Sequence, residues 1–342
     1  MKYKTFIPLC AVGMVSLLGC QNVETNAEER SETLVLTSFL PPMHSQNTDV
    51  LSAFIEEVEA ATDGRVSIDV YYGDSLGAAD YQYDMAVTGT SDFALGMHGY
   101  TPGVFPLTEV VELPNIAQSA EQSTAMLQHL LEEYPEIEEE HEGTNIAWLF
   151  SVEPYQILTS NTKVENPEDL EGLKIRSPSS IANEILESLG AIPVSMPFGE
   201  VYESMQRGVI DGAYAPASVM KNYQTNEVTN YIARGDFSTA NHFVVYNEDS
   251  LNALQDEDRE AIENILADDW GMVAGKTYDK DEVDAWQIAE DDGIEVVHVR
   301  DNHWQVWEEA MSEVSQQWIE RANALGAPGN QMYEELLNLD DD

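Results

Sequence analysis

The chain has 342 residues, of which 15 are Lys or Arg and 63 are Asp or Glu, so its formal net charge is −48. So few cations cannot build the basic surface that nucleic-acid phosphates require, and nucleic-acid binding is excluded. Hydrophobic residues make up 43% of the sequence, which excludes a disordered acidic chain. The length predicts a folded protein of two domains or one large one.

The charged fraction is an ordinary 23%, and only its sign is skewed. Such a surface repels itself in dilute buffer, whereas at molar salt the Debye length is about 3 Å and most of that repulsion is screened. We therefore expect a halophilic protein. An acidic surface at ordinary salt is the alternative that composition leaves open.

The first residues have the pattern of an export signal. Lys2 and Lys4 precede an apolar run over residues 6–18, which is long enough for the core of a signal peptide and too short to span a bilayer permanently. We expect residues 1–19 to be removed as a signal peptide, so that the mature protein is extracytoplasmic.

The end of this signal resembles a bacterial lipobox. Residues 17–20 read Leu-Leu-Gly-Cys, and Cys20 would be lipidated and become the new N-terminus. Residues 20–32 are polar and without apolar period, so we expect a flexible tether to the cell membrane. An ordinary secretory signal with a coincidental cysteine is the alternative. Because Cys10 leaves with the signal, no disulfide is expected.

Strand patterns alternate with helical patterns in the rest of the chain. Strands are expected near 34–39, 66–70, 92–97, 146–150, 156–159, 173–176, 193–196, 213–215 and 296–299. Helices are expected near 50–58, 78–87, 181–189, 201–207, 249–268, 271–290 and 303–324. This order predicts an α/β fold of two lobes with a mainly parallel sheet, joined by long helices.

Open α/β sheets bind ligands beyond the carboxyl ends of their strands. Candidate ligand contacts at such positions are Phe39, His44, His98, Tyr100, Arg176, Phe198 and Tyr214. Arg176 stands out because cations are scarce and a guanidinium can hold a carboxylate through two hydrogen bonds. The alternative for Arg176 is an internal salt bridge to one of the 63 acids.

Catalytic patterns are weak. Residues 73–77 read Gly-Asp-Ser-Leu-Gly and match the nucleophile elbow G-x-S-x-G, but they follow only the second strand and no oxyanion segment precedes them. A serine hydrolase using Ser75 is therefore the less favoured alternative to a glycine-rich turn. His141-Glu142 lacks a second histidine at the zincin spacing, and phosphate-binding glycine loops are missing. We expect no catalytic residue, cofactor or metal site.

Three segments, 167–176, 189–202 and 206–212, resemble the signature of the substrate-binding subunits of tripartite ATP-independent periplasmic (TRAP) transporters, the DctP-like family. The resemblance extends over about residues 34–325. It implies a two-lobed, periplasmic-binding-protein-like (type II) α/β fold with a long interlobe helix. The implied N-terminal lobe is 33–153 plus 242–281, and the C-terminal lobe is 154–241 plus 282–342.

The implied function is capture of a small organic acid by a monomer and its delivery to the small and large TRAP membrane subunits. A binding protein of an ATP-driven importer, or a signalling receptor, would share the fold and remains the alternative. Under the resemblance, the turn over residues 73–77 lies on the ligand side.

The resemblance also assigns residues. Arg176 aligns with the arginine that pairs with the ligand carboxylate in this family, and Gln156 stands where some members have a second arginine. Ala215 replaces an asparagine that often follows Asp-Gly, so sialic-acid-like and simple C4-dicarboxylate ligands are disfavoured. We expect a carboxylate held by Arg176 and Gln156, with a hydroxyl, keto or aromatic end packed by Tyr100, Phe198 and Tyr214. The remaining pocket candidates are Phe39, His44, His98 and His242.

Overall fold

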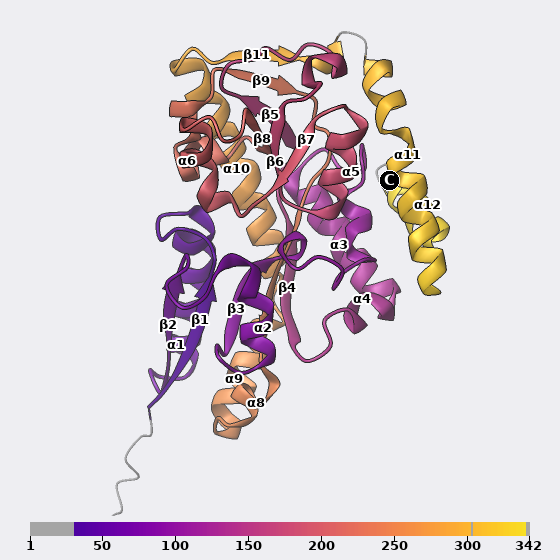
Figure 1. Cartoon of the computed structure of the whole chain (residues 1–342). Coiled ribbons are helices and arrows are strands. Elements are labelled where there is room, and N and C mark those ends of the chain that lie inside the picture. The colour runs from indigo at the N-terminus through magenta and orange to yellow at the C-terminus, as the bar shows by residue number, and fades with distance from the viewer. Residues whose placement is uncertain (1–30, 302–303, 340–342) are drawn as a thin grey trace, which may run out of the picture. The chain divides into compact units, whose positions relative to one another are not determined.

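The computed structural model describes residues 31–301 and 304–339. Two sheets organise these residues (Figure 1). The first has the strand order β2-β1-β3-β10-β4, with β1 (Glu32–Ser38), β2 (Val66–Tyr72), β3 (Phe93–Met97), β4 (Asn145–Ser151) and β10 (Asn241–Tyr246). The second has the order β11-β9-β5-β8-β6-β7, with β5 (Tyr155–Thr159), β6 (Lys174–Ser177), β7 (Ile192–Ser195), β8 (Gly212–Pro216), β9 (Tyr231–Arg234) and β11 (Glu295–His298).

We call the first sheet with the elements packed on it the first lobe, and the second sheet with its elements the second lobe. The chain passes from the first sheet to the second after β4, returns at β10, and enters the second again at β11. The lobe boundaries expected from the sequence are compatible with these crossings and stay a prediction.

Both sheets are mixed, but five of the nine strand pairings among the described residues are parallel, including those of β1 with β2 and β3, so the expected mainly parallel arrangement holds for the first three strands and by a narrow margin overall. β10 runs antiparallel to both β3 and β4, and β5 runs antiparallel to both β8 and β9. The reason is the crossings between lobes. β10 enters its sheet from the opposite lobe instead of through a helical crossover, so the right-handed βαβ rule does not fix its direction.

The helices are α1 (Ser52–Ala61), α2 (Gln82–Val87), α3 (Ala120–Glu133), α4 (Pro135–Glu139), α5 (Ser180–Ser188), α6 (Val201–Gln206), α7 (Val219–Tyr223), α8 (Glu248–Asn252), α9 (Asp256–Leu266), α10 (Trp270–Asp291), α11 (Trp304–Leu325) and α12 (Gly329–Asn338). Short turns matter at the site: η1 (Gln46–Leu51), η3 (His98–Tyr100), η4 (Thr108–Glu112) and η6 (Phe198–Glu200). The continuous helix expected over 249–268 is two helices, α8 and α9.

Helix α10 bridges the lobes. It packs on α3 and β4 of the first lobe and on α7 of the second. Its contact with α3 requires a glycine, because a Cβ on Gly275 would lie 2.7 Å from Thr124 Oγ1 and 3.0 Å from the carbonyl oxygen of Ala120. Any side chain here would separate the two helices.

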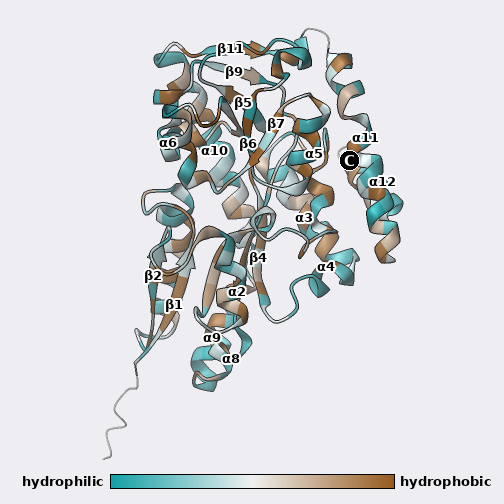
Figure 2. Cartoon of the chain, in the orientation of Figure 1, coloured by the Kyte–Doolittle hydropathy of each residue, from teal (hydrophilic) through white to brown (hydrophobic). Residues whose placement is uncertain are grey.

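The C-terminal helices also contact both lobes. Helix α11 packs on α5, and α12 contacts η4. Trp307 and Trp318 of α11 are fully buried, and Trp318 Nε1 donates a hydrogen bond to the carbonyl oxygen of Pro106 at 2.9 Å. Hydrophobic segments alternate with hydrophilic ones along α11 and α12, as expected for helices with one buried face (Figure 2). Across residues 31–301 and 304–339, none of the helices has the length and apolar content needed to cross a membrane.

Candidate functional site

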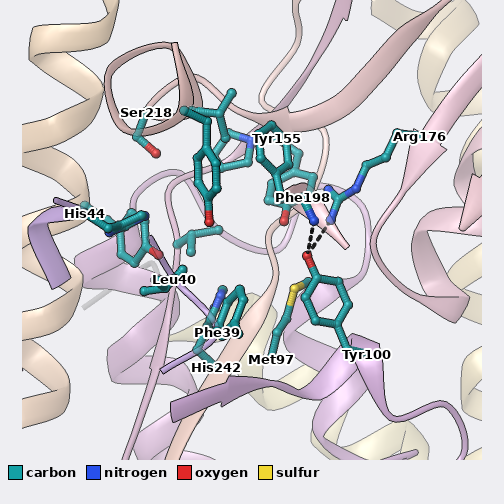
Figure 3. Close-up of a pocket in the computed structure, with 15 residues that line it drawn as sticks. Phe39, Leu40, His44, Met97, Tyr100, Tyr155, Arg176, Phe198, Ser218 and His242 are labelled. Carbon is teal, nitrogen blue, oxygen red and sulfur yellow. Dashed lines mark hydrogen bonds between the residues drawn. The ribbon is translucent and has the colours of Figure 1, made fainter. Parts of the chain in front are cut away.

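A pocket lies where strand ends of the two lobes meet (Figure 3). The first lobe lines it with Phe39, Leu40, His44, Met97, Tyr100, Val152 and His242, the second with Tyr155, Arg176, Phe198, Pro216, Ser218, Val219 and Tyr223, and α10 with Tyr278. Six of these fifteen side chains are Phe or Tyr, and two more are His. The lining therefore suits a flat, apolar molecule with few polar groups.

Arg176 is the charged residue of this lining, and only 1% of it is exposed. Its Nε donates to the carbonyl oxygen of Met196 at 3.1 Å, and its Nη1 to that of Tyr214 at 3.2 Å. The guanidinium carbon also lies 5.0 Å from the ring centre of Phe198, a cation–π contact. Among the described residues, no Asp or Glu oxygen lies within 4.0 Å of a guanidinium nitrogen of Arg176, the limit for an ion pair. The internal salt bridge left open by the sequence is thus absent here.

Two donors of the second lobe converge on one oxygen of the first. Arg176 Nη2 and the backbone N–H of Phe198 each donate to the phenol oxygen of Tyr100 at 2.9 Å. Figure 3 shows both bonds meeting at that oxygen. Every acceptor of the Arg176 guanidinium named here is uncharged. The positive charge is held in place by neutral groups.

The histidines of the pocket are uncharged at neutral pH. His242 stacks between Phe39 and Phe150, with ring-centre distances of 5.6 Å and 5.2 Å. Burial lowers the pKa of His242 to about 3. Burial likewise lowers the pKa of His44 to about 4, where the ring meets Tyr223 and Tyr278 edge-on. Arg176, and not these rings, therefore carries the positive charge of the pocket lining.

The pocket is narrow in this structure. Its volume is about 30 Å³, whereas a protein cavity that binds benzene measures roughly 150 Å³. An organic ligand can enter only if the lobes separate or side chains move.

Six of the candidates expected from the sequence share this pocket: Phe39, His44, Tyr100, Arg176, Phe198 and His242. Gln156 does not reach it. Its Nε2 donates to Asp236 Oδ1 at 2.6 Å, and its Oε1 accepts from the backbone N–H of Gly235 at 2.9 Å. Gln156 thus anchors the turn after β9, while its neighbour Tyr155 lines the pocket, because successive residues of a strand face opposite sides.

His98 and Tyr214 also lie outside the lining. The ring of His98 packs on Phe105 and Phe243, with centres 4.7 Å and 5.1 Å away, in the interior of the first lobe. Tyr214 is 0% exposed, and its phenol oxygen lies 2.7 Å from Ser238 Oγ. Its carbonyl oxygen is the part that matters to the site, since it fixes Arg176 Nη1.

The sequence did not indicate Tyr155, Ser218, Tyr223 and Tyr278 as pocket residues. The last two stand in or beside helices, where an aromatic residue at helical spacing is indistinguishable from a core residue. The Gly73–Gly77 turn does not itself line this pocket, although the Gly73 N–H donates to the carbonyl oxygen of the lining residue Leu40 at 3.1 Å, and its ligand-side role stays a prediction. Ser75 on that turn is exposed, which is unlike a nucleophile held in a pocket.

Two α/β lobes, a bridging helix and a pocket between strand ends of the two lobes define a two-lobed solute-binding protein. The chain belongs to the DctP family, bacterial extracellular solute-binding protein family 7, whose family model matches residues 36–321. The resemblance seen in the sequence is confirmed at this level. The protein is therefore an extracytoplasmic solute-binding protein and not an enzyme.

Solved structures agree with this assignment and confirm the two-lobed fold. The chain is 28% identical to a TRAP solute-binding protein from a marine metagenome, specific for aromatic acids and bound to metahydroxyphenylacetate, with a TM-score of 0.83 over 90% of this chain and 98% of that one. A TRAP protein from Rhodoferax ferrireducens with copurified benzoate is 25% identical, with a TM-score of 0.83 over 90% and 97% of the two chains. One from Bordetella bronchiseptica with bound (R)- and (S)-mandelate is 26% identical, with a TM-score of 0.83 over 90% and 98%.

Proposed function

We propose that this protein captures an aromatic carboxylate and delivers it to the small and large membrane subunits of a TRAP transporter. The observation that carries the proposal is Arg176, a buried guanidinium with uncharged hydrogen-bond acceptors inside an aromatic pocket. Delivery to membrane subunits follows from the family and from the TRAP proteins that share its fold.

The carboxylate part of the proposal rests on electrostatics. A buried charge without a partner of opposite sign costs several kcal/mol, because water no longer solvates it. In a chain with 63 acids, leaving Arg176 without one is an unusual arrangement that a ligand carboxylate would complete. Charge-assisted hydrogen bonds are about twice as strong as neutral ones.

The proposal of an aromatic ligand rests on the side chains that line the pocket. Phe39, Phe198, Tyr223 and Tyr278 offer ring faces and edges to a flat ligand. The three solved relatives described above hold aromatic acids, and each is at least 25% identical to this chain. A hydroxyl group on the ligand would suit His242, whose buried Nδ1 has no hydrogen-bond partner among the described residues.

Thermal unfolding with a ligand panel tests this proposal. Benzoate, 3-hydroxybenzoate and mandelate are compared with succinate and glucuronate, for the wild type and for Arg176→Met. A ligand at 100 times its dissociation constant adds about 2.7 kcal/mol to stability, which raises the melting temperature by several degrees. We expect this shift for aromatic acids with the wild type and none with Arg176→Met.

Arg234→Met is the matched control, because Arg234 also lies over an aromatic ring, Trp286 at 4.2 Å, but is outside the pocket. It should keep the ligand shift. Stabilisation by succinate or glucuronate alone would contradict the aromatic class, and a full shift with Arg176→Met would contradict the site.

We also propose that the mature protein is a lipoprotein monomer. The signal peptide, the lipobox and Cys20 lie outside the described residues, and the sequence pattern alone supports them. Expression of Cys20→Ser should move the protein from the membrane fraction to the soluble fraction. Intact mass of the wild type should show removal of 19 residues and an added lipid, and an unmodified Cys20 would contradict the anchor. Gel filtration of the lipid-free domain, residues 31–342, should give the apparent mass of a single chain.

A further inference from the structure

Tyr100 separates two cavities. On one side is the narrow pocket of about 30 Å³, and on the other is a larger cavity of about 220 Å³, lined by Tyr100 itself with Pro102, Ser177, Ser179, Asn183 and Pro197. The second cavity exceeds the roughly 150 Å³ that holds a benzene ring. Space for an aromatic ring therefore exists beside Tyr100 and not inside the pocket.

The phenol oxygen of Tyr100 occupies the strongest polar position of the pocket. Arg176 Nη2 and the Phe198 N–H both point to it at 2.9 Å. A carboxylate oxygen carries negative charge and has free lone pairs. It would therefore form stronger hydrogen bonds with these two donors than the neutral phenol does. A ligand carboxylate that accepts from this pair of donors and the Tyr100 phenol at its present position exclude each other.

We propose that Tyr100 is a specificity-determining gate. In this structure its phenol oxygen occupies the donors of Arg176 and Phe198 that a ligand carboxylate would use, and on binding its ring moves into the 220 Å³ cavity. This inference rests on the proposed function, since it requires a carboxylate at Arg176.

Local structure permits this movement. Tyr100 ends the three-residue turn η3, follows Gly99, and touches Phe39 by one ring edge at a centre distance of 5.5 Å. Its departure from the pocket frees the volume of a phenol ring, which is close to the volume that an aromatic acid needs. The exchange replaces one ring by another and keeps the two donors satisfied.

The gate also explains how neutral molecules are rejected. A neutral alcohol or amide would replace one uncharged acceptor by another and gain nothing at Arg176. A carboxylate gains charge-assisted bonds and displaces the phenol. Selectivity then comes from a competing internal group as well as from attraction.

Tyr100→Phe tests the gate by removing the phenol oxygen and keeping the ring. We expect the dissociation constant of benzoate, measured by titration calorimetry, to fall about 3- to 10-fold, because the ligand no longer displaces two hydrogen bonds. Benzamide, a neutral analogue, should bind Tyr100→Phe measurably better than it binds the wild type. Weaker benzoate binding by Tyr100→Phe would overturn the inference, since it would make the phenol a ligand contact.

Two further variants distinguish the gate from a general effect of removing a buried phenol and test the movement of the ring. Tyr83→Phe removes another buried phenol, bonded to the carbonyl oxygen of Glu142 at 3.0 Å, and should leave benzoate affinity unchanged. Asn183→Phe fills the cavity into which the ring moves, and should weaken benzoate binding at least 10-fold in the wild-type background. Unchanged affinity in Asn183→Phe would overturn the proposed movement.

The two proposals fail differently. If the wild type binds no aromatic carboxylate, the proposed function fails and the gate with it. If the wild type binds benzoate through Arg176 and Tyr100→Phe binds it more weakly, the gate alone fails.

Discussion

Gly99 of the first lobe lies so close to Ser179 of the second that a Cβ on Gly99 would be 2.6 Å from the Cβ of Ser179. The same Cβ would be 2.7 Å from the carbonyl oxygen of Pro178. Both neighbours belong to the rigid start of α5, where Ser179 caps the helix by accepting from the Ala182 N–H, so neither can rotate away. Closure of the lobes to this distance therefore requires glycine at position 99.

Gly99→Ala should hold the lobes apart and weaken ligand binding by about 10-fold or more, since a misplacement of the order of 1 Å suffices to disrupt a positioned site. Gly199→Ala is the matched control. No heavy atom lies within 4 Å of a Cβ there, so its affinity should stay near the wild-type value. Calorimetric titration with benzoate compares the two. Equal affinities would show that the bound state does not bring Gly99 against Ser179.

Glu112 joins the same two lobes and should make stability depend on pH. It is 2% exposed, its Oε2 accepts from Ser179 Oγ at 2.8 Å, and its Oε1 accepts from the backbone N–H of Asn241 at 3.2 Å. Burial raises its pKa from 4.5 to about 7, and the hydrogen bonds oppose that shift only in part. The folded protein thus keeps a proton on Glu112 that the unfolded chain has lost between these pH values.

The sign follows from this difference in bound protons. The contribution of Glu112 to the free energy of unfolding is fully present below pH 4.5 and is lost as the pH rises through 7. Glu112→Gln imitates the protonated form, so the variant should gain stability relative to the wild type by up to about 3 kcal/mol between pH 4.5 and pH 7.5. Urea unfolding across this range measures the gain. Glu187→Gln, at an exposed position, should show no such trend. If the stability of Glu112→Gln changed with pH in parallel with that of the wild type, the prediction would be contradicted.

The sequence indicated the two-lobed fold and the position of Arg176 because both depend on local signals. Arg176 is the last residue but one of β6 and lies within an ordered motif, and the strand ends of an α/β sheet converge on one site. Strand β10 gave no such signal, since its place between β3 and β4 depends on pairing with residues about 90 to 150 positions earlier.

Two of the three misplaced site residues, Gln156 and His98, share a physical cause. Gln156 was expected in the pocket, and Tyr155 lies there; His98 was expected, and Met97 lies there. Each error is one position, which in an extended segment exchanges one face for the other. The sequence indicated where a strand begins or ends, but not which of two adjacent residues at that end lines the pocket.

Asp281 on α10 should stabilise the lobe junction behind the pocket. It is 1% exposed, accepts from Lys221 Nζ at 2.7 Å and from Asn222 Nδ2 at 2.9 Å on the second lobe, and also accepts from Ser45 Oγ on the first. Asp281→Ala should lower the free energy of unfolding by about 2 kcal/mol, since hydrogen bonds to a buried charge are lost. Benzoate affinity should also fall, because His44 and Tyr223 adjoin these partners.

Asp284→Ala is the control for Asp281, because it removes the second carboxylate on Lys221, also at 2.7 Å, but is half exposed. Its effect should stay within about 1 kcal/mol, as for other surface ion pairs. Urea unfolding of both variants makes the comparison. Equal losses would mean that Lys221, and not the buried carboxylate, stabilises the junction.

The net charge of −48 leads to the last prediction, that the protein is adapted to high salt. At low ionic strength the excess acids repel one another in the folded state, and salt shortens the range of that repulsion to about 3 Å at 1 M. The melting temperature should therefore rise steeply between dilute buffer and molar KCl, and equally in NaCl if screening is the cause. The association rate of benzoate should rise as well, because the same field repels an anion before Arg176 can attract it. A flat melting temperature would contradict the halophilic adaptation, and a rise in KCl that NaCl does not reproduce would point to a bound ion instead of screening.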